Sequence, residues 1–355
     1  MKPIKIFSIL LMLCLGIATV AIAQPAAVKK AANTTFTLTT FDAKGSILST
    51  SNGVFVSNNG ICVSTWKPFV GAMKAEVTDN NGQKYSVETI LGANELYDVA
   101  KFKITAKTNA ALFAPSVVAN SAAWIVMPSQ AGDPIKANID KVEKFMTKYN
   151  YCVLSTTASE KYNGAPVLND KGQIVGIYNS NGTLQSATDA KYANDFVLTG
   201  LSQNDPTLLQ SGIRIALPQQ PDEAIIALML SATKIESLRM ATINDFLQKF
   251  PTLNNGYVTL ATKLLANGEV AEADKTLQQA IAKTTAKDEA HYNYGRLIFQ
   301  GVTTAAIADK AKAQGWTLDK AMNEANEAYK LNPAPVYKHL QAQIVYTKGN
   351  YQQAY

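Results

Sequence analysis

The sequence predicts a two-domain chain in which a β domain precedes an α-helical domain. Residues 34–200 contain short runs with alternating apolar side chains, separated by tight-turn signals such as Asn58-Asn59-Gly60. Many short strands at this spacing are typical of a barrel or a sandwich. From residue 222 onward, alanine is abundant and apolar residues recur every three or four positions, which indicates helices. We therefore expect a β domain over 24–205, a proline-containing linker over 206–221 and helices over 222–355.

Composition excludes several classes of protein. A chain of 355 residues corresponds to about two domains, and its 47% of hydrophobic and 17% of charged residues exclude a disordered chain. Only Arg214, Arg239 and Arg296 are arginines, and no basic cluster is present, which argues against nucleic-acid recognition. The two histidines are His291 and His339, so imidazole chemistry is confined to the last third of the chain.

The N-terminus has the pattern of a secretory signal peptide over residues 1–23. Two lysines give a basic start, an apolar run covers 6–20, and Ala21-Ile22-Ala23 supplies a small-residue cleavage pattern. The apolar run is shorter than the ~20 residues of a membrane span, so an uncleaved membrane anchor is the weaker alternative. We expect an exported protein, periplasmic or secreted at the cell envelope, whose mature chain begins at Gln24 and has no transmembrane segment.

Two cysteines follow residue 23, and each lies in an apolar, strand-like run. Export would permit a disulfide between Cys62 and Cys152. Their apolar surroundings favour two buried free thiols instead, and both alternatives stay open. Two cysteines without a nearby histidine do not make a zinc site, so we expect neither a metal nor a cofactor.

The alternating pattern places the strands of the β domain. Each run is apolar and rich in β-branched or aromatic residues. The expected strands cover 35–40, 54–57, 61–64, 85–91, 99–104, 123–127, 151–155 and 174–178. The turns at 58–60 and 79–82 have the composition of tight hairpin turns.

The helical region contains a repeated helix pair. The first copy consists of Tyr257, Leu260, Ala261 and Leu264 on one helix, a Gly268-Glu269 turn, and Ala273, Leu277 and Ala280 on a second. These size classes at these spacings resemble a tetratricopeptide repeat, in which small alanines let the helices approach closely. A second copy is expected over 288–333, with extra residues between its helices, and a third begins at 335 and is incomplete at residue 355. A non-repeating helical bundle is the alternative.

Two segments of the β domain carry a further resemblance. Residues 52–72 read NGVFVSNNGICVSTWKPFVGA, and residues 91–104 read LGANELYDVAKFKI. They resemble the segments that carry the catalytic histidine and aspartate in trypsin-like serine proteases of the Deg, or high-temperature-requirement, group. Lys67 stands at the histidine position, and Asp98 matches the aspartate.

A third segment resembles the nucleophile loop of the same proteases. Residues 161–177 begin KYNGAPVLN and continue with GQIVGI from residue 172. Asn163 stands at the position of the catalytic serine, and Lys161 replaces a glycine that helps to form the oxyanion hole. The resemblance covers roughly residues 50–200 and implies two six-stranded antiparallel barrels with a cleft between them.

Serine-protease chemistry fails at these positions. An asparagine amide is not a useful nucleophile, and a lysine ammonium with a pKa near ~10.4 is not a base at neutral pH unless it is buried. No catalytic residues are therefore expected at the triad-equivalent positions Lys67, Asp98 and Asn163. Two arrangements remain open for the lysine. It forms an ion pair with Asp98, or it forms a serine–lysine dyad with Ser64 or Ser159.

These expectations combine into an inactive trypsin-like domain followed by helical repeats. Such a protein would act as a scaffold or adaptor, binding protein or peptide partners through the barrel cleft by strand addition and through the concave face of the repeats. The alternative is a serine-type endopeptidase with an unusual nucleophile and base, Ser159 or Ser64 with Lys67. In a third interpretation the barrels are a spacer and the repeats bind alone.

Overall fold

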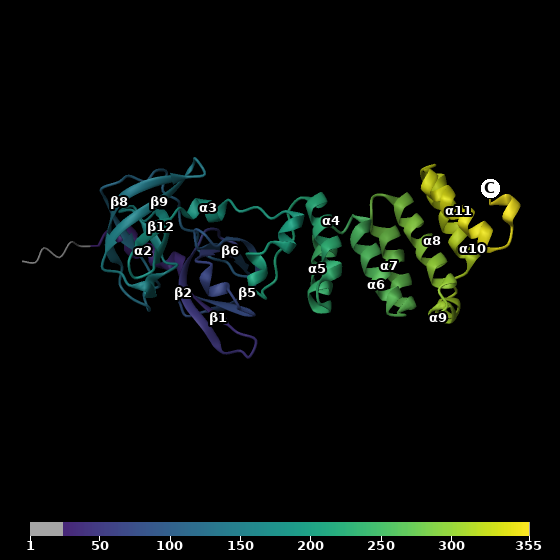
Figure 1. Cartoon of the computed structure of the whole chain (residues 1–355), viewed down its shortest axis with the longest axis horizontal. Coiled ribbons are helices and arrows are strands. Elements are labelled where there is room, and N and C mark those ends of the chain that lie inside the picture. The colour runs from purple at the N-terminus through teal and green to yellow at the C-terminus, as the bar shows by residue number, and fades with distance from the viewer. Residues whose placement is uncertain (1–23, 355) are drawn as a thin grey trace, which may run out of the picture. The chain divides into compact units, whose positions relative to one another are not determined.

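The computed structural model describes residues 24–354, which form two compact units. The first unit comprises residues 24–196 and 210–213, and the second comprises 197–209 and 214–354. The expected signal peptide lies outside the described residues. Figure 1 draws the strands in purple to teal and the helices that follow them in green to yellow. Within the described part of the chain, no helix is both long and apolar enough to span a membrane.

Six antiparallel strands close the first barrel of the first unit, in the order β1-β2-β3-β6-β5-β4. They are β1 (Thr35–Phe41), β2 (Ile47–Phe55), β3 (Ile61–Ser64), β4 (Lys74–Asp79), β5 (Lys84–Asn94) and β6 (Val99–Ile104), and the short helix α2 (Ala26–Ala31) precedes them. Alternate side chains of β1 point inward, and Phe36 packs against Phe55 and Phe102 with ring centroids 4.8 and 5.9 Å apart.

The second barrel closes with the strand order β10-β11-β12-β9-β8-β7. Its strands are β7 (Ser121–Ile125), β8 (Ile135–Phe145), β9 (Tyr149–Thr156), β10 (Pro166–Leu168), β11 (Ile174–Ser180) and β12 (Gln185–Thr188), followed by the short helix α3 (Ala190–Asn194). Its core includes Ile139, Leu154, Val167 and Tyr178, each of which is at most 4% exposed.

The two closed barrels confirm the predicted β architecture, the double barrel of trypsin-like proteins. The alternating pattern located the apolar strands but missed β4, β8, β10 and β12. Along β8 most side chains are polar and exposed, and Ala137, Ile139 and Phe145 are its buried residues. Strand β10 has three residues, too few for a periodicity to be visible.

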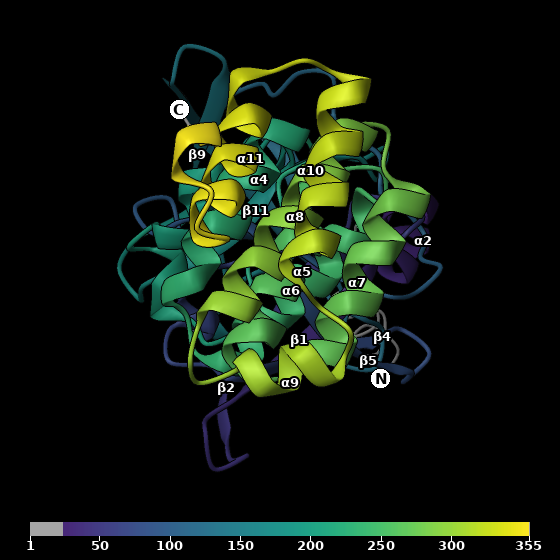
Figure 2. The same cartoon turned by 90° about the vertical axis from the view of Figure 1, so that its right-hand side faces the viewer.

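The second unit is helical, as predicted. Its α-helices are α4 (Pro221–Leu230), α5 (Glu236–Lys249), α6 (Asn254–Ala266), α7 (Val270–Lys283), α8 (Lys287–Thr303), α9 (Ala308–Ala313), α10 (Leu318–Leu331) and α11 (Pro335–Thr347). Consecutive helices from α4 to α8 pack together, α9 packs against α8, and α10 packs against α8 and α11. Figure 1 shows α5 to α8 side by side, and Figure 2 shows α10 lying along α8.

Small residues permit these close helix contacts. Ala273 and Ala280 on α7, and Ala321, Ala325 and Ala328 on α10, are all at most 1% exposed. The extra residues expected in the second copy form α9, between α8 and α10. The helix pairs therefore match the expected positions, while their assignment as tetratricopeptide repeats stays a prediction.

The segment predicted as a linker, residues 206–221, takes part in both units. Gln210 to Ile213 belong to the first unit, and the division between the units begins at Phe196 rather than at residue 205. Leu217 is 6% exposed and packs with α4 and α5. The difference arises because apolar residues of this segment are buried, which the prolines did not reveal.

The two cysteines are buried free thiols in different barrels. Cys62 lies on β3 and Cys152 on β9. Burial raises the pKa of the Cys62 thiol well above its usual value, and raises the pKa of Cys152 to about 12. Both sulfurs are therefore protonated and unreactive at neutral pH.

Candidate functional site

The three triad-equivalent positions lie together where the two barrels meet. The backbone N–H of Lys67 donates to Asp98 Oδ1 at 2.8 Å, and Asn179 Nδ2 donates to Asp98 Oδ2 at 2.5 Å. The residue after Asn179, Ser180, donates its backbone N–H to Asn163 Oδ1 at 2.7 Å. These hydrogen bonds, together with the peptide bond between Asn179 and Ser180, connect the three positions.

The carboxylate of Asp98 accepts hydrogen bonds from backbone amides and not from the side chain of Lys67. Its Oδ1 also accepts the N–H of Trp66 at 2.9 Å, so it holds the two amides that begin the short 3-10 helix Lys67–Phe69. Asp98 is 9% exposed and has a φ of 47°, a left-handed conformation that is uncommon outside glycine.

The expected ion pair between Lys67 and Asp98 is not formed. The side chain of Lys67 is exposed and makes no ion pair with Asp98 among residues 24–354. The reason is that Trp66, Lys67 and Asn179 already donate to the carboxylate.

Both polar atoms of the Asn163 side-chain amide are hydrogen-bonded to one residue, Ser180, at the end of β11. Its Oδ1 accepts the Ser180 N–H, and its Nδ2 donates to the Ser180 carbonyl at 3.0 Å. This pair of bonds extends the β10–β11 ladder, whose preceding bonds join Gly164 and Ala165 to Tyr178. A serine hydroxyl has one proton on a shorter side chain, so it could not reproduce both bonds.

The backbone around Asn163 is also engaged. Its N–H donates to the Glu160 carbonyl at 2.9 Å, at the end of the 3-10 helix Glu160–Tyr162. Its carbonyl accepts the N–H of Asn52 at 3.0 Å and the hydroxyl of Ser51 at 2.9 Å, which ties the second barrel to β2. An oxyanion hole requires amides that are free to bind the developing negative charge. In this conformation the amide of residue 163 is not free.

The two serines of the alternative dyad lie in different surroundings. Ser64 is fully buried, and its hydroxyl donates to the Asn52 carbonyl at 2.5 Å. Ser159 is exposed and precedes the 3-10 helix Glu160–Tyr162. Among residues 24–354, neither hydroxyl is hydrogen-bonded to Lys67.

Asn52 and Asn179 belong to the site but were not singled out in the sequence. Asn52 Nδ2 donates to the carbonyls of Lys161 and Asn163, at 2.8 and 3.2 Å. Asn52 lies at the start of the first resembling segment, and Asn179 directly follows an expected strand. Their partners are more than 80 positions away, so no local pattern marks them.

Both histidines lie in the helical unit. His291 Nδ1 is 2.7 Å from Glu324 Oε2, between α8 and α10. His339 on α11 lines a cavity with Phe299 and Tyr346. Within the described residues, no group of three or more His, Cys, Asp or Glu side chains is placed to hold a metal ion.

Comparisons with known proteins add a partial likeness. No family model and no curated protein matches the chain. Among solved structures, the HtrA-type protease AlgW, solved with a tripeptide, is 18% identical with a TM-score of 0.43. The match covers 49% of this chain and 62% of that one. At this identity and TM-score, the double-barrel fold rests on the strand order of this chain.

Proposed function

We propose that this protein is a non-catalytic, trypsin-like protein that is exported and binds peptide or protein partners as a scaffold or adaptor. The observation that carries the proposal is the identity of Asn163 and the way in which its side chain is hydrogen-bonded. A residue without a nucleophilic atom stands at the serine position, and both ends of its amide are bound to Ser180.

Lys67, which stands where the resemblance expects the catalytic histidine, also supports a non-catalytic role. Lys67 is exposed, and its side chain makes no ion pair with Asp98 in the described part of the chain. Asp98, which in a working triad would orient an imidazole, instead binds the backbone of residues 66 and 67. The second possibility, a peptidase using Ser159 or Ser64 with Lys67, lacks a hydrogen bond between nucleophile and base.

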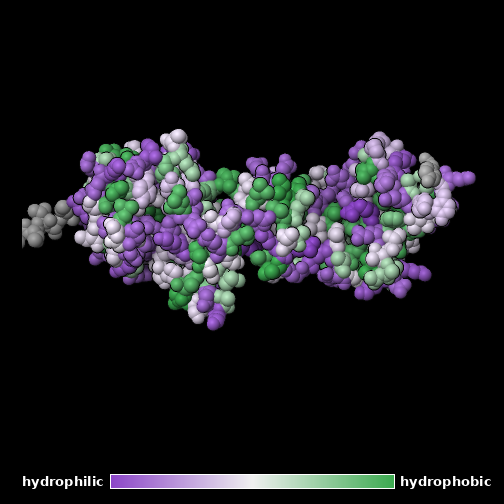
Figure 3. Space-filling model, viewed as in Figure 1, coloured by the Kyte–Doolittle hydropathy of each residue, from purple (hydrophilic) through white to green (hydrophobic). Residues whose placement is uncertain are grey.

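The helical unit offers a surface for a partner. Met229 on α4 and Ile235 just before α5 are 70% and 68% exposed. Leu201, in the same unit, is 70% exposed. Figure 3 shows apolar side chains gathered over the region of α4. Exposed apolar clusters of this kind are typical of interaction sites.

A fluorophosphonate probe tests the loss of catalysis. We expect no covalent labelling of the purified protein under conditions in which trypsin is labelled to completion, because Asn163 cannot attack phosphorus. Labelling would contradict the proposal. If labelling occurred, its loss in the variant Ser159→Ala or Ser64→Ala would identify the nucleophile. The variant Thr157→Ala is the neighbouring control and should keep the labelling.

Capture from the envelope fraction of the source cells tests the binding role. We expect the tagged protein to retain partners that the double variant Met229→Asp/Ile235→Asp loses, because charge at an apolar contact is costly to bury. Lys67→Ala is the control and should retain them. Equal recovery with all three proteins would remove this surface from the proposal, and no specific recovery would contradict the scaffold role.

A further inference from the structure

A cavity of about 320 Å³ opens on the second barrel, away from the triad-equivalent positions. It lies between the segment over residues 115–122, which includes the first two residues of β7, and the β10–β11 turn. Strand β11 begins at Ile174 beside this turn and ends at Ser180, so the cavity and Asn163 lie at opposite ends of the strand. Its lining consists of Pro115, Ser116, Val117, Val118, Ser121, Ala122, Ile139, Asn169, Asp170, Lys171, Gln173 and Val175.

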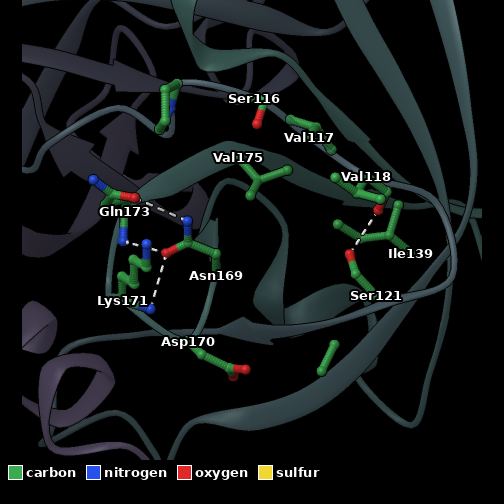
Figure 4. A pocket seen from close by; sticks show the side chains of 12 residues that line it. Ser116, Val117, Val118, Ser121, Ile139, Asn169, Asp170, Lys171, Gln173 and Val175 are labelled. Carbon is green, nitrogen blue, oxygen red and sulfur yellow. Dashed lines mark hydrogen bonds between the residues drawn. The ribbon is translucent and has the colours of Figure 1, made fainter.

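One side of the cavity is apolar. Ile139 and Val175, at 2% and 3% exposure, are held by the barrel core, and Val118 stands at the rim with 63% exposure. Figure 4 shows Val118 and Ile139 on the side opposite Lys171 and Gln173, with Val175 between them. A small aliphatic group would bury apolar surface there, and Val118 would lose much of its exposure.

The polar side is held rigidly by the turn. Asn169 Oδ1 accepts the backbone N–H groups of Lys171 and Gln173, both at 3.0 Å, and its Nδ2 donates to Gln173 Oε1 at 3.0 Å. Gly172 has a φ of 72°, and a Cβ there would lie 2.7 Å from the carbonyl oxygen of Ala27. Helix α2 therefore packs behind the turn and fixes it from the other side.

Three hydrogen-bond donors of this cavity have no protein partner among residues 24–354. They are Lys171 Nζ, Gln173 Nε2 and Ser116 Oγ. The other charged group is Asp170, whose Oδ1 already accepts from Trp124 Nε1 at 2.8 Å. An apolar cavity lined by these donors has the character of a ligand site, and the donors suit a carboxylate.

We propose that this cavity binds the free C-terminus of a polypeptide that ends in a small aliphatic residue such as valine. The terminal carboxylate takes the donors of Lys171, Gln173 and Ser116. The last side chain packs against Val118, Ile139 and Val175, and the rest of the chain leaves over the exposed rim. The site does not depend on the cleft, so it can exist whether or not the barrels retain catalysis.

Fluorescence anisotropy with an N-terminally labelled hexapeptide ending in Ala-Ala-Val tests this proposal. We expect saturable binding of the free-acid peptide to the full protein and at least tenfold weaker binding of its C-terminal amide. Lys171→Met and Val118→Asp should each weaken binding of the free acid at least tenfold. Both side chains are exposed, so the variants should fold, which unchanged thermal unfolding would verify. Lys141→Met, on β8 outside the cavity, is the matched control.

The other outcomes overturn the proposal. No saturable binding of the free-acid peptide at millimolar concentration would show that the cavity is not such a site. Equal binding of acid and amide, or of wild type and Lys171→Met, would remove the carboxylate contact. Competition by free L-valine or isovalerate at the same concentration as the peptide would show that the occupant is a small carboxylate and not a chain terminus.

Discussion

Replacing Gly164 with alanine is expected to destabilise the barrel unit by about 3 kcal/mol or more. Gly164 follows Asn163 and has a φ of 84°. A Cβ at this position would lie 2.1 Å from the carbonyl oxygen of Asn52 and 2.7 and 2.9 Å from the hydroxyls of Ser51 and Ser64. The two barrels would have to separate here, and the hydrogen bonds around Asn163 would be disrupted with them.

Gly82→Ala is the matched control for this change. Gly82 has a φ of 80°, but an added Cβ would meet no atom within 4 Å. It therefore measures the backbone strain alone, about 1 kcal/mol. Urea unfolding followed by tryptophan fluorescence checks both variants, because Trp66 and Trp124 report on the barrels. Equal losses in the two variants would contradict the close contact between the barrels at Gly164.

Asp274→Ala is expected to destabilise the helical unit by about 3 kcal/mol. Asp274 is 5% exposed, and its Oδ1 accepts from Tyr294 Oη, Trp316 Nε1 and Lys320 Nζ at 2.5, 2.6 and 3.1 Å. Gln278 Nε2 donates to its other oxygen at 2.7 Å. Alanine would leave four donors of this cluster without their acceptor, and the free energy of unfolding would fall accordingly.

This effect should depend on pH. Burial alone would raise the pKa of Asp274, but hydrogen bonds from Tyr294, Trp316 and Lys320 together hold it below its ordinary value. The stability that the ionised carboxylate contributes is complete above the unfolded-state pKa of about 3.9 and is lost as the pH falls through the lower folded-state pKa. The difference between wild type and Asp274→Ala should therefore be constant from neutral pH down to about 5 and shrink below about 4.

Unfolding followed by circular dichroism at 222 nm measures this difference, since the helices dominate that signal. Asp319→Ala is the control. Its carboxylate pairs with Lys348 at the surface with 82% exposure, and such pairs contribute little. If Asp274→Ala unfolds at the same urea concentration as Asp319→Ala, the buried cluster does not hold the helices together.

Much of the candidate site could be located from the sequence. The resemblance of three short segments to the triad segments of trypsin-like serine proteases places Lys67, Asp98 and Asn163 at one site. The partners of these residues could not be predicted in the same way. The bonds of Asn163 to Ser180 depend on the register between β10 and β11, and the choice of Asp98 between a lysine side chain and backbone amides depends on angles that no spacing encodes.

The sequence by itself determined the two parts of the chain and the residue types at the triad-equivalent positions, because side-chain period and chemical identity are local properties. The tertiary structure decided which hydrogen bonds the side chains of Asp98 and Asn163 make, because these bonds join residues more than 15 positions apart in the chain. It also revealed strands such as β8 and the packing of residues 206–221, where burial arises from contacts with distant segments. Asn163 illustrates both levels. Its identity places an amide at the position where the resemblance expects the serine, and its contacts with Ser180 and Asn52 give it a structural role between the barrels.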